Sequence, residues 1–307
     1  MSIIQVENLT KKFKKLTALS ELNFEVQKGE IFGIIGPDGA GKSTLFNILA
    51  TLTLPTSGTI TVLDHDILKQ YKQIRKEIGY LPGTFSLYPD LTVQENLTFF
   101  ATMYGSGIKE NLPMIMPIWR QISPFKNREA GKLSGGMKQK LALCCALIHR
   151  PKILLLDEPT TGVDPVSRKE FWDLLDKIRE YQVTVVVSTP YMDEVGRCDR
   201  IALMQDGRFI TVDTPESIIK NYKGDLYAIK TSQLFKLLDI MPQFQEKCSY
   251  YPYGEYFHIS FYHDTKHAKN SFLQFLKQHE IEFEKMEHIS PLLEDCFIEI
   301  IKEDRNV

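Results

Sequence analysis

The sequence lacks long hydrophobic runs, a cysteine framework and an excess of either charge. Its longest uninterrupted apolar run, residues 141–148, has eight residues, whereas a membrane-spanning helix requires about 20. The N-terminus has none of the apolar character of a signal peptide. We therefore expect a chain that neither spans a membrane nor is secreted, and that acts on membranes through a protein partner.

The five cysteines are an odd number without the spacing of metal ligands, which predicts reduced thiols. Lysine and arginine total 37 against 39 aspartate and glutamate, for a net charge of −2. This balance provides no basic field for nucleic acid or for an anionic membrane surface. We therefore expect no nucleic-acid partner.

The 307 residues, of which 43% are hydrophobic, predict about two domains with packed cores. Short apolar runs predict strands that alternate with helices, and this pattern is typical of a mostly parallel sheet covered on both faces. The strands are expected at 3–9, 22–26, 31–35, 153–156, 183–187 and 201–204, and the helices at 43–52, 166–181 and 190–197. Residues 92–150 interrupt the alternation with helices at 93–104 and 135–149, which indicates a helical insertion.

The pattern changes again after Pro215. The last 85 or so residues predict the order β-α-β-β-α-β, which is typical of a ferredoxin-like domain. A final helix from Ser290 is expected to bury one face that carries Leu292, Leu293, Cys296, Phe297, Ile300 and Ile301. The histidines of this region, His258, His263, His267, His279 and His288, fall on different expected elements, so packed or solvated histidines are favoured over a metal site.

A glycine-rich segment follows the expected strand at 31–35 and precedes a helix. Its sequence, G-P-D-G-A-G-K-S at 36–43, matches the phosphate-binding pattern G-x-x-x-x-G-K-[ST]. In this pattern backbone N–H groups at a helix N-terminus surround a phosphate, the lysine adds charge and the hydroxyl ligates Mg²⁺. The alternative is a glycine-rich turn with an exposed lysine.

Two carboxylates, Asp157 and Glu158, end the expected buried strand at 153–156. Ligands of an open α/β sheet bind at this edge. Asp157 is therefore a candidate to hold Mg²⁺ through water, and Glu158 to polarise a water molecule in line with a terminal phosphate. The alternative is an ordinary acidic pair at a strand end.

A second helix start has the character of an anion site. Ser134 is expected to cap this helix, and Gly135 and Gly136 expose backbone donors. One chain has no use for two such sites on one triphosphate, so this site would face a nucleotide held by another subunit. A merely capped helix is the alternative.

Together these segments resemble the ATP-binding cassette (ABC) ATPases over about residues 2–222. The phosphate loop at 36–44, the signature L-S-G-G-M at 133–137, the carboxylate segment at 153–158 and a D-loop-like T-T-G-V-D-P at 160–165 follow in the family's order. The resemblance implies an α/β P-loop NTPase core over 1–222, with an antiparallel β subdomain and a helical subdomain at about 92–150. Residues 223–307, the ferredoxin-like α+β domain, are similar to the C-terminal extension of ATPase subunits from ABC-2 type export systems, which implies a regulatory or dimerisation role.

The resemblance also implies ATP and Mg²⁺ as cofactors and assigns residues to roles. Lys42 and Glu158 would be catalytic, Ser43 and Asp157 would hold the metal, and Phe13 would stack on adenine. The signature residues Ser134, Gly135, Gly136 and Met137, with Asp164, would act on the nucleotide of a partner subunit. The remaining nucleotide-binding positions are Gly36, Pro37, Asp38, Gly39, Ala40, Gly41 and Thr44.

Two positions depart from the family pattern. Gly83 stands where the family usually has a glutamine that contacts Mg²⁺ and the attacking water, and Pro190 stands where it usually has a histidine that contacts the γ-phosphate. Neither residue has a side-chain donor. We expect Thr189 to cap a helix with Pro190 in its first turn, and either Thr189 or Thr84 to be able to compensate for the lost donors.

We therefore expect an ATP-binding and ATP-hydrolysing subunit of a membrane exporter, peripheral at the cytoplasmic face and paired with an integral membrane permease and a second ATPase subunit. The permease would dock on the helical insertion, through Val93, Leu97, Phe99, Phe100 and Tyr104. The alternative for some of these residues is that they form the internal core of that insertion. One alternative is a catalytically weak partner in a heterodimer of ATPase subunits, which the changes at 83 and 190 favour. Others are a fully active homodimer, a nucleotide-gated regulatory module and a non-transport ABC ATPase.

Overall fold

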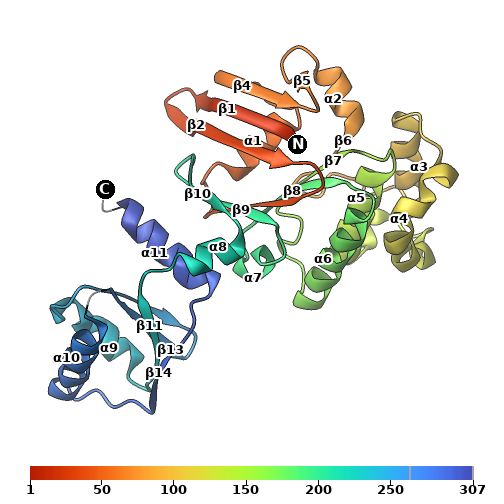
Figure 1. Cartoon of the computed structure of the whole chain (residues 1–307). Helices are drawn as coiled ribbons and strands as arrows, with labels where there is room; N and C mark the ends of the chain where they lie inside the picture. The colour runs from red at the N-terminus through yellow and green to blue at the C-terminus, as the bar shows by residue number, and fades with distance from the viewer. Residues whose placement is uncertain (263, 306–307) are drawn as a thin grey trace. The chain divides into compact units, whose positions relative to one another are not determined.

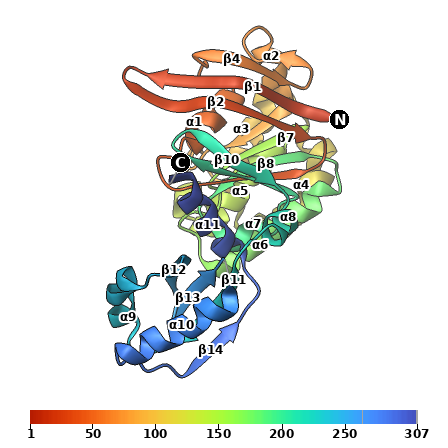
Figure 2. The same cartoon turned by 60° about the vertical axis from the view of Figure 1, so that its left-hand side comes forward.

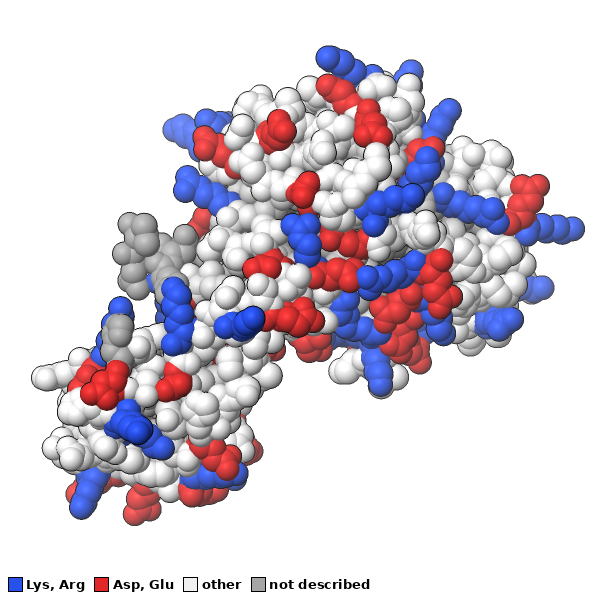
Figure 3. All heavy atoms as spheres, in the orientation of Figure 1, with Lys and Arg blue, Asp and Glu red and all other residues white. Residues whose placement is uncertain are grey.

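The computed structural model describes residues 1–262 and 264–305. It divides into two compact units, Met1–Pro215 and Glu216–Val307, and each has its own hydrophobic core. On the face drawn in Figure 3, lysines and arginines are interspersed with aspartates and glutamates over both units. None of the helices within the described residues has the length and apolar character needed to cross a membrane.

A six-stranded sheet in the order β10-β9-β3-β8-β7-β6 forms the centre of the first unit (Figure 1). The five strands from β9 to β6 run parallel, and β10 adds an antiparallel edge. Residues of β3, β7 and β8 are buried on both faces, as expected of parallel strands covered by helices. The strands are β3 (Ile31–Ile35), β6 (Ile78–Leu81), β7 (Ile153–Asp157), β8 (Thr184–Thr189), β9 (Arg200–Gln205) and β10 (Arg208–Asp213).

A second, antiparallel sheet has the order β2-β1-β4-β5. Helix α1 (Lys42–Leu49) lies between the two sheets, because Leu45, Phe46, Ile48 and Leu49 share one core with residues of both. Figures 1 and 2 show this three-layer arrangement. The strands are β1 (Ser2–Phe13), β2 (Leu16–Gln27), β4 (Ser57–Val62) and β5 (His65–Asp66), and helix α2 (Tyr71–Glu77) leads into β6.

Three helices form the insertion between β6 and β7: α3 (Val93–Met103), α4 (Ile108–Ile122) and α5 (Gly135–Leu147). Helix α4 contains two prolines, Pro113 and Pro117. Pro117 has no N–H to donate to the Pro113 carbonyl one turn earlier, and the Tyr181 hydroxyl donates to that oxygen instead, at 3.1 Å. This bond ties the insertion to the segment after α6 (Pro165–Arg179). Short 3₁₀ turns lie at Ser123–Phe125 and Ala130–Lys132, and α7 (Met192–Val195) follows β8.

The second unit has a four-stranded antiparallel sheet in the order β12-β13-β11-β14. This is the strand order of a β-α-β-β-α-β ferredoxin-like domain, as the sequence predicts. Helices α9 and α10 contribute to the core on one face, and α11 contacts the other through a hydrogen bond of 2.8 Å between Asp295 and His258. The elements are α8 (Pro215–Lys220), β11 (Asp225–Lys230), α9 (Leu234–Ile240), a 3₁₀ turn (Met241–Gln243), β12 (Cys248–Tyr253), β13 (Tyr256–Phe261), α10 (Thr265–Gln278), β14 (Lys285–His288) and α11 (Leu293–Arg305).

The last helix differs from its prediction at its start, because it begins at Leu293 rather than at Ser290. Leu293, Cys296 and Phe297 are buried as expected, but Leu292 precedes the helix and is 47% exposed. Its backbone N–H instead donates to the Asp295 side chain. Within residues 1–262 and 264–305 no three histidine, cysteine or acidic side chains gather in a metal-binding cluster, and His263 lies outside the described residues.

Candidate nucleotide-binding site

A pocket of about 740 Å³ opens at the carboxyl edge of the six-stranded sheet. The phosphate loop, the two carboxylates and position 83 meet there, although they are far apart in the sequence. Two segments that the sequence analysis missed also line it, the start of β2 and the turn between β9 and β10. The lining residues are Phe13, Leu16, Thr17, Ala18, Asp38, Gly39, Gly41, Lys42, Ser43, Thr44, Gly83, Thr84, Asp157, Glu158, Asp206 and Gly207.

The loop at 36–41 requires glycine at two positions for different reasons. A Cβ at Gly36 would lie 2.2 Å from the Met204 carbonyl oxygen on β9, so a side chain there collides with backbone. Gly41, with φ of 110°, occupies the left-handed region directly before α1. The loop therefore brings the first N–H groups of α1 to the pocket, where the helix dipole favours an anion. Pro37 and Ala40 belong to this loop but do not line the pocket, and the Ala40 N–H donates to the Pro37 carbonyl.

Lys42 is buried, with 4% of its side chain exposed. Its ammonium donates to the carbonyl oxygens of Gly36 at 2.8 Å and Pro37 at 3.1 Å. The same nitrogen lies 3.2 Å from Glu158 Oε1. The positive charge is thus fixed at the loop and is paired with Glu158.

Asp157 ends β7 with its carboxylate buried. The Ser188 hydroxyl on β8 donates to Asp157 Oδ1 at 2.7 Å. Burial raises the pKa of Asp157, and hydrogen bonds from Ser188 and Ser43 partly oppose the shift. The Ser43 hydroxyl and the Asp157 carboxylate are hard oxygen donors side by side, which is the type of pair that Mg²⁺ takes along with phosphate oxygens and water.

Glu158 has a positive φ of 49°. Its N–H donates to the Ser188 hydroxyl at 2.9 Å, and the Thr161 hydroxyl donates to its Oε2 at 3.3 Å. Ser188 therefore orients both carboxylate residues. Ser188 was not among the site residues predicted from the sequence; the signal for it was a hydroxyl at the end of the strand that pairs with β7.

Gly83 lies at the pocket, next to the end of β7. A Cβ at this position would be 3.2 Å from the Asp157 carbonyl oxygen and 4.0 Å from its Oδ2. A side chain longer than glycine would therefore project beside the candidate metal ligand. Glycine leaves that place to solvent.

The expectation for residues 189 and 190 was wrong. Thr189 is the last residue of β8, and the residue that precedes α7 is Tyr191, so Pro190 lies in a bend before the helix rather than in its first turn. The Thr189 side chain is fully buried and its hydroxyl donates to Glu194. Thr189 is therefore unable to replace a donor toward a phosphate, whereas Thr84 lines the pocket.

The signature segment lies at the start of α5. Ser134 caps the helix by accepting from the Met137 N–H at 3.4 Å, and a Cβ at Gly136 would lie 2.7 Å from Ser167, so glycine allows α5 to approach the start of α6. Asp164 caps α6 through the Ser167 N–H at 2.9 Å. Of the residues described around the pocket, none belongs to 134–137 or is Asp164. The signature segment therefore lies outside the pocket that the phosphate loop of the same chain lines.

Phe13 is 46% exposed at the rim of the pocket, with the Lys11 ammonium 4.6 Å from its ring centroid.

The prediction for the helical insertion was partly wrong, because Val93 and Leu97 are fully buried in the core of the insertion. Phe99 and Tyr104 are 41% and 37% exposed, and Phe100 is half-buried. Helical spacing identified an apolar helix but not which of its residues face outward.

Comparisons with known proteins agree with this geometry. A family model described as ABC transporter matches residues 19–161. The probable multidrug ABC transporter ATP-binding protein YbhF of Escherichia coli is 42% identical over 219 residues, which are 71% of this chain but only 38% of that protein. The Nod factor export ATP-binding protein I of Burkholderia lata is 35% identical over 224 residues, 72% of this chain and 74% of that protein.

The linearmycin resistance ATP-binding protein LnrL of Bacillus subtilis is 36% identical over 227 residues, 73% of each chain. A solved structure of the ATP-binding subunit of an ABC transporter has a TM-score of 0.65 at 26% identity, covering 71% of this chain and 92% of that one. A dimeric post-hydrolysis state of the cassette MJ0796, bound to ADP and Pi, has a TM-score of 0.63 at 29% identity, covering 69% and 98%. These likenesses confirm the predicted fold class.

Proposed function

Because the chain belongs to the family of ABC transporter ATP-binding proteins, we propose that it is the ATP-hydrolysing subunit of a membrane exporter. The resemblance inferred from the motifs is thereby confirmed at the level of the family. The observation that carries the proposal is the meeting of Lys42, Ser43, Asp157 and Glu158 in one pocket. The names of these relatives, which refer to multidrug transport, Nod factor export and linearmycin resistance, favour an exporter.

The chain's own groups have distinct tasks in this proposal. The N-terminal N–H groups of α1 and the Lys42 ammonium bind the phosphates. Ser43 and Asp157 would hold Mg²⁺, which would neutralise phosphate charge when bound. Phosphate takes the place of Glu158 beside Lys42, and the freed carboxylate accepts the proton of a water molecule that attacks the terminal phosphorus. The bond between that phosphorus and the bridging oxygen breaks, so the products are ADP and phosphate.

A second ATPase subunit is part of the proposal. Ser134 caps α5 and Gly136 lies in its first turn, outside the pocket that Lys42 lines in the same chain. A signature helix from another subunit would complete the nucleotide site, with Asp164 at the junction. The dimeric cassette among the similar structures supports this arrangement.

The permease would dock on the exposed aromatic side chains of the helical insertion. Phe99 and Tyr88 make an edge-to-face contact with centroids 4.8 Å apart, and they are 41% and 47% exposed. Exposed apolar clusters of this kind mark protein contacts. We expect Phe99→Ser to reduce copurification with the permease from detergent-solubilised membranes. Leu54→Ser, at a residue 68% exposed elsewhere on the first unit, is the control and should leave copurification unchanged.

Positions 83 and 190 favour a pairing with a different ATPase subunit. Loss of one preorganised donor typically costs about 3 kcal/mol of transition-state stabilisation, or about a hundredfold in rate. The test is phosphate release by the purified chain, alone and with a second ATPase subunit. Slow turnover alone and faster turnover in the mixture support the heterodimer. A homodimer that hydrolyses ATP at the rate of ordinary family members, with Glu158→Gln abolishing it, would show that the active-homodimer alternative is correct.

A further inference from the structure

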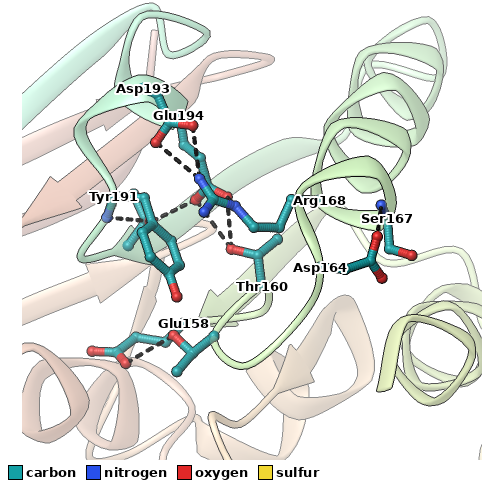
Figure 4. A network of polar contacts seen from close by, with 10 residues as sticks. Glu158, Thr160, Asp164, Ser167, Arg168, Tyr191, Asp193 and Glu194 are labelled. Carbon is teal, nitrogen blue, oxygen red and sulfur yellow. Dashed lines mark hydrogen bonds and ion pairs between the residues drawn. The ribbon is translucent and has the colours of Figure 1, made fainter. Parts of the chain in front are cut away.

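One polar network near the pocket has no role in the proposed hydrolysis (Figure 4). Its centre is Glu194 on α7, which is 4% exposed. The Glu194 carboxylate accepts from the Thr160 hydroxyl at 2.8 Å, from Arg168 Nε at 3.1 Å and from the Thr189 hydroxyl. These three donors come from three segments, so one buried carboxylate joins the chain after β7, the end of β8 and the start of α6.

Arg168 extends the network from the first turns of α6. Its terminal nitrogen donates to both oxygens of Asp193, at 2.7 Å and 2.9 Å. Its guanidinium lies over the Tyr191 ring at 3.8 Å, a distance typical of a cation–π contact. Arg168 therefore holds both Glu194 and the bend that contains Pro190.

The network reaches the reacting carboxylate through the loop at 158–164. Thr160 is 1% exposed and bonded to Glu194, and the next residue, Thr161, donates to Glu158 Oε2. Glu158 has a positive φ, so its orientation depends on how the following loop is held. The same loop ends at Asp164, which caps the helix that carries Arg168.

We propose that Arg168 and Glu194 are positioning residues for ATP hydrolysis, which set the orientation of Glu158 through Thr160 and Thr161. The inference rests on the proposed function. Rigid placement of Glu158 affects the rate, because its carboxylate lines the pocket and is the proposed acceptor of the attacking water's proton. Arg168 and Glu194 are not among the residues that line the pocket. A fixed orientation of Glu158 should therefore affect the chemical step rather than nucleotide binding.

The first test is steady-state ATP hydrolysis by Arg168→Gln and Arg168→Lys. We expect Arg168→Gln to lower kcat by about tenfold to a hundredfold, the range typical when a partner that orients a functional group is lost. KM for ATP should stay within about twofold. Arg168→Lys should recover part of the loss, since it keeps the charge but not the guanidinium fork.

The matched control is Arg179→Gln on the same helix. Arg179 also pairs with a carboxylate, Asp199, but away from the pocket, and its side chain is 44% exposed. The kcat of Arg179→Gln should equal that of the unaltered chain. An equal loss of kcat in Arg168→Gln and Arg179→Gln, or a loss that appears in KM, would overturn the inference.

A double-mutant cycle separates positioning from general destabilisation. If Arg168 acts through Thr161, then Arg168→Gln and Thr161→Val should be non-additive in kcat, because either change releases Glu158. Strict additivity contradicts the proposed route. Amide hydrogen exchange of residues 159–164 provides a readout that needs no turnover, and Arg168→Gln should increase it more than Arg179→Gln does. If the unaltered chain does not hydrolyse ATP, the proposed function fails, and unchanged exchange at 159–164 would then refute the inference separately.

Discussion

Replacing Glu158 by glutamine should destabilise the nucleotide-free chain and tighten its binding of ATP at the same time. In the structure Lys42 and Glu158 are paired at 3.2 Å, with side chains 4% and 21% exposed. A pair at that distance has a Coulomb energy of about 5 kcal/mol at an effective dielectric constant near 20. Removing one partner of a buried pair typically costs about 3–5 kcal/mol. Glutamine still accepts from Lys42 and Glu158 is partly solvated, so we expect a loss of about 2 kcal/mol.

This loss predicts two measurable changes of opposite sign. The unfolding midpoint of the nucleotide-free first unit should fall by roughly 4–8 °C, at about 2–4 °C per kcal/mol for a domain of this size. ATP binding should tighten by about tenfold to thirtyfold, because phosphate no longer has to displace a carboxylate from Lys42. The assays are thermal unfolding without and with MgATP, and calorimetry with a non-hydrolysable ATP analogue.

Glu170→Gln is the matched control. It breaks an ion pair with another poorly exposed lysine, Lys140, which is 10% exposed and lies on α5 away from the pocket. This variant should lose stability without a change in ATP affinity. Unaltered ATP affinity in Glu158→Gln, or an equal gain in Glu170→Gln, would refute the reasoning that nucleotide binding exchanges one anion for another at Lys42.

Three further predictions concern other parts of the first unit. Gly83→Gln should raise kcat by about tenfold or more by restoring a polar group beside Asp157; phosphate release with unchanged ATP affinity checks this, and a lower rate would contradict it. Gly36→Ala should abolish nucleotide binding and lower the unfolding midpoint, since its Cβ meets the Met204 carbonyl at 2.2 Å; ATP-induced stabilisation is the readout. Burial lowers the pKa of His149 below 6.5. As pH falls below about 6.5, the unfolded chain therefore binds a proton before the folded chain does, and the free energy of unfolding should decrease. Denaturant titrations at several pH values check this, and His149→Gln should flatten the pH dependence.

The phosphate loop and the two carboxylates were predictable because short, local sequence patterns identify them. Glycine spacing before Lys42 and an apolar strand before Asp157 determine their positions without knowledge of the rest of the chain. The ferredoxin-like strand order followed from an equally local pattern of turns and apolar runs. These features depend on neighbours in sequence.

The contacts made across strands were not predictable in the same way. Ser188 orients Asp157 and Glu158 only because β8 pairs with β7 in a register that puts Asp157 beside Ser188. Glu194 and Arg168 are ordinary surface residue types, and Glu194 is buried where donors from three separate segments meet its carboxylate. The same limit applies to the helical insertion, because helical spacing alone did not distinguish buried Val93 and Leu97 from exposed Phe99.

The separation of Ser134 from the pocket that Lys42 lines has a genetic consequence. If two copies of this chain pair, a defective phosphate loop in one copy and a defective signature in the other fall at the same composite site. The second site of that mixed dimer then contains only unaltered residues. Two inactive alleles, one at Lys42 and one at Ser134, should therefore complement each other when expressed in one cell, whereas two different alleles of the phosphate loop should not.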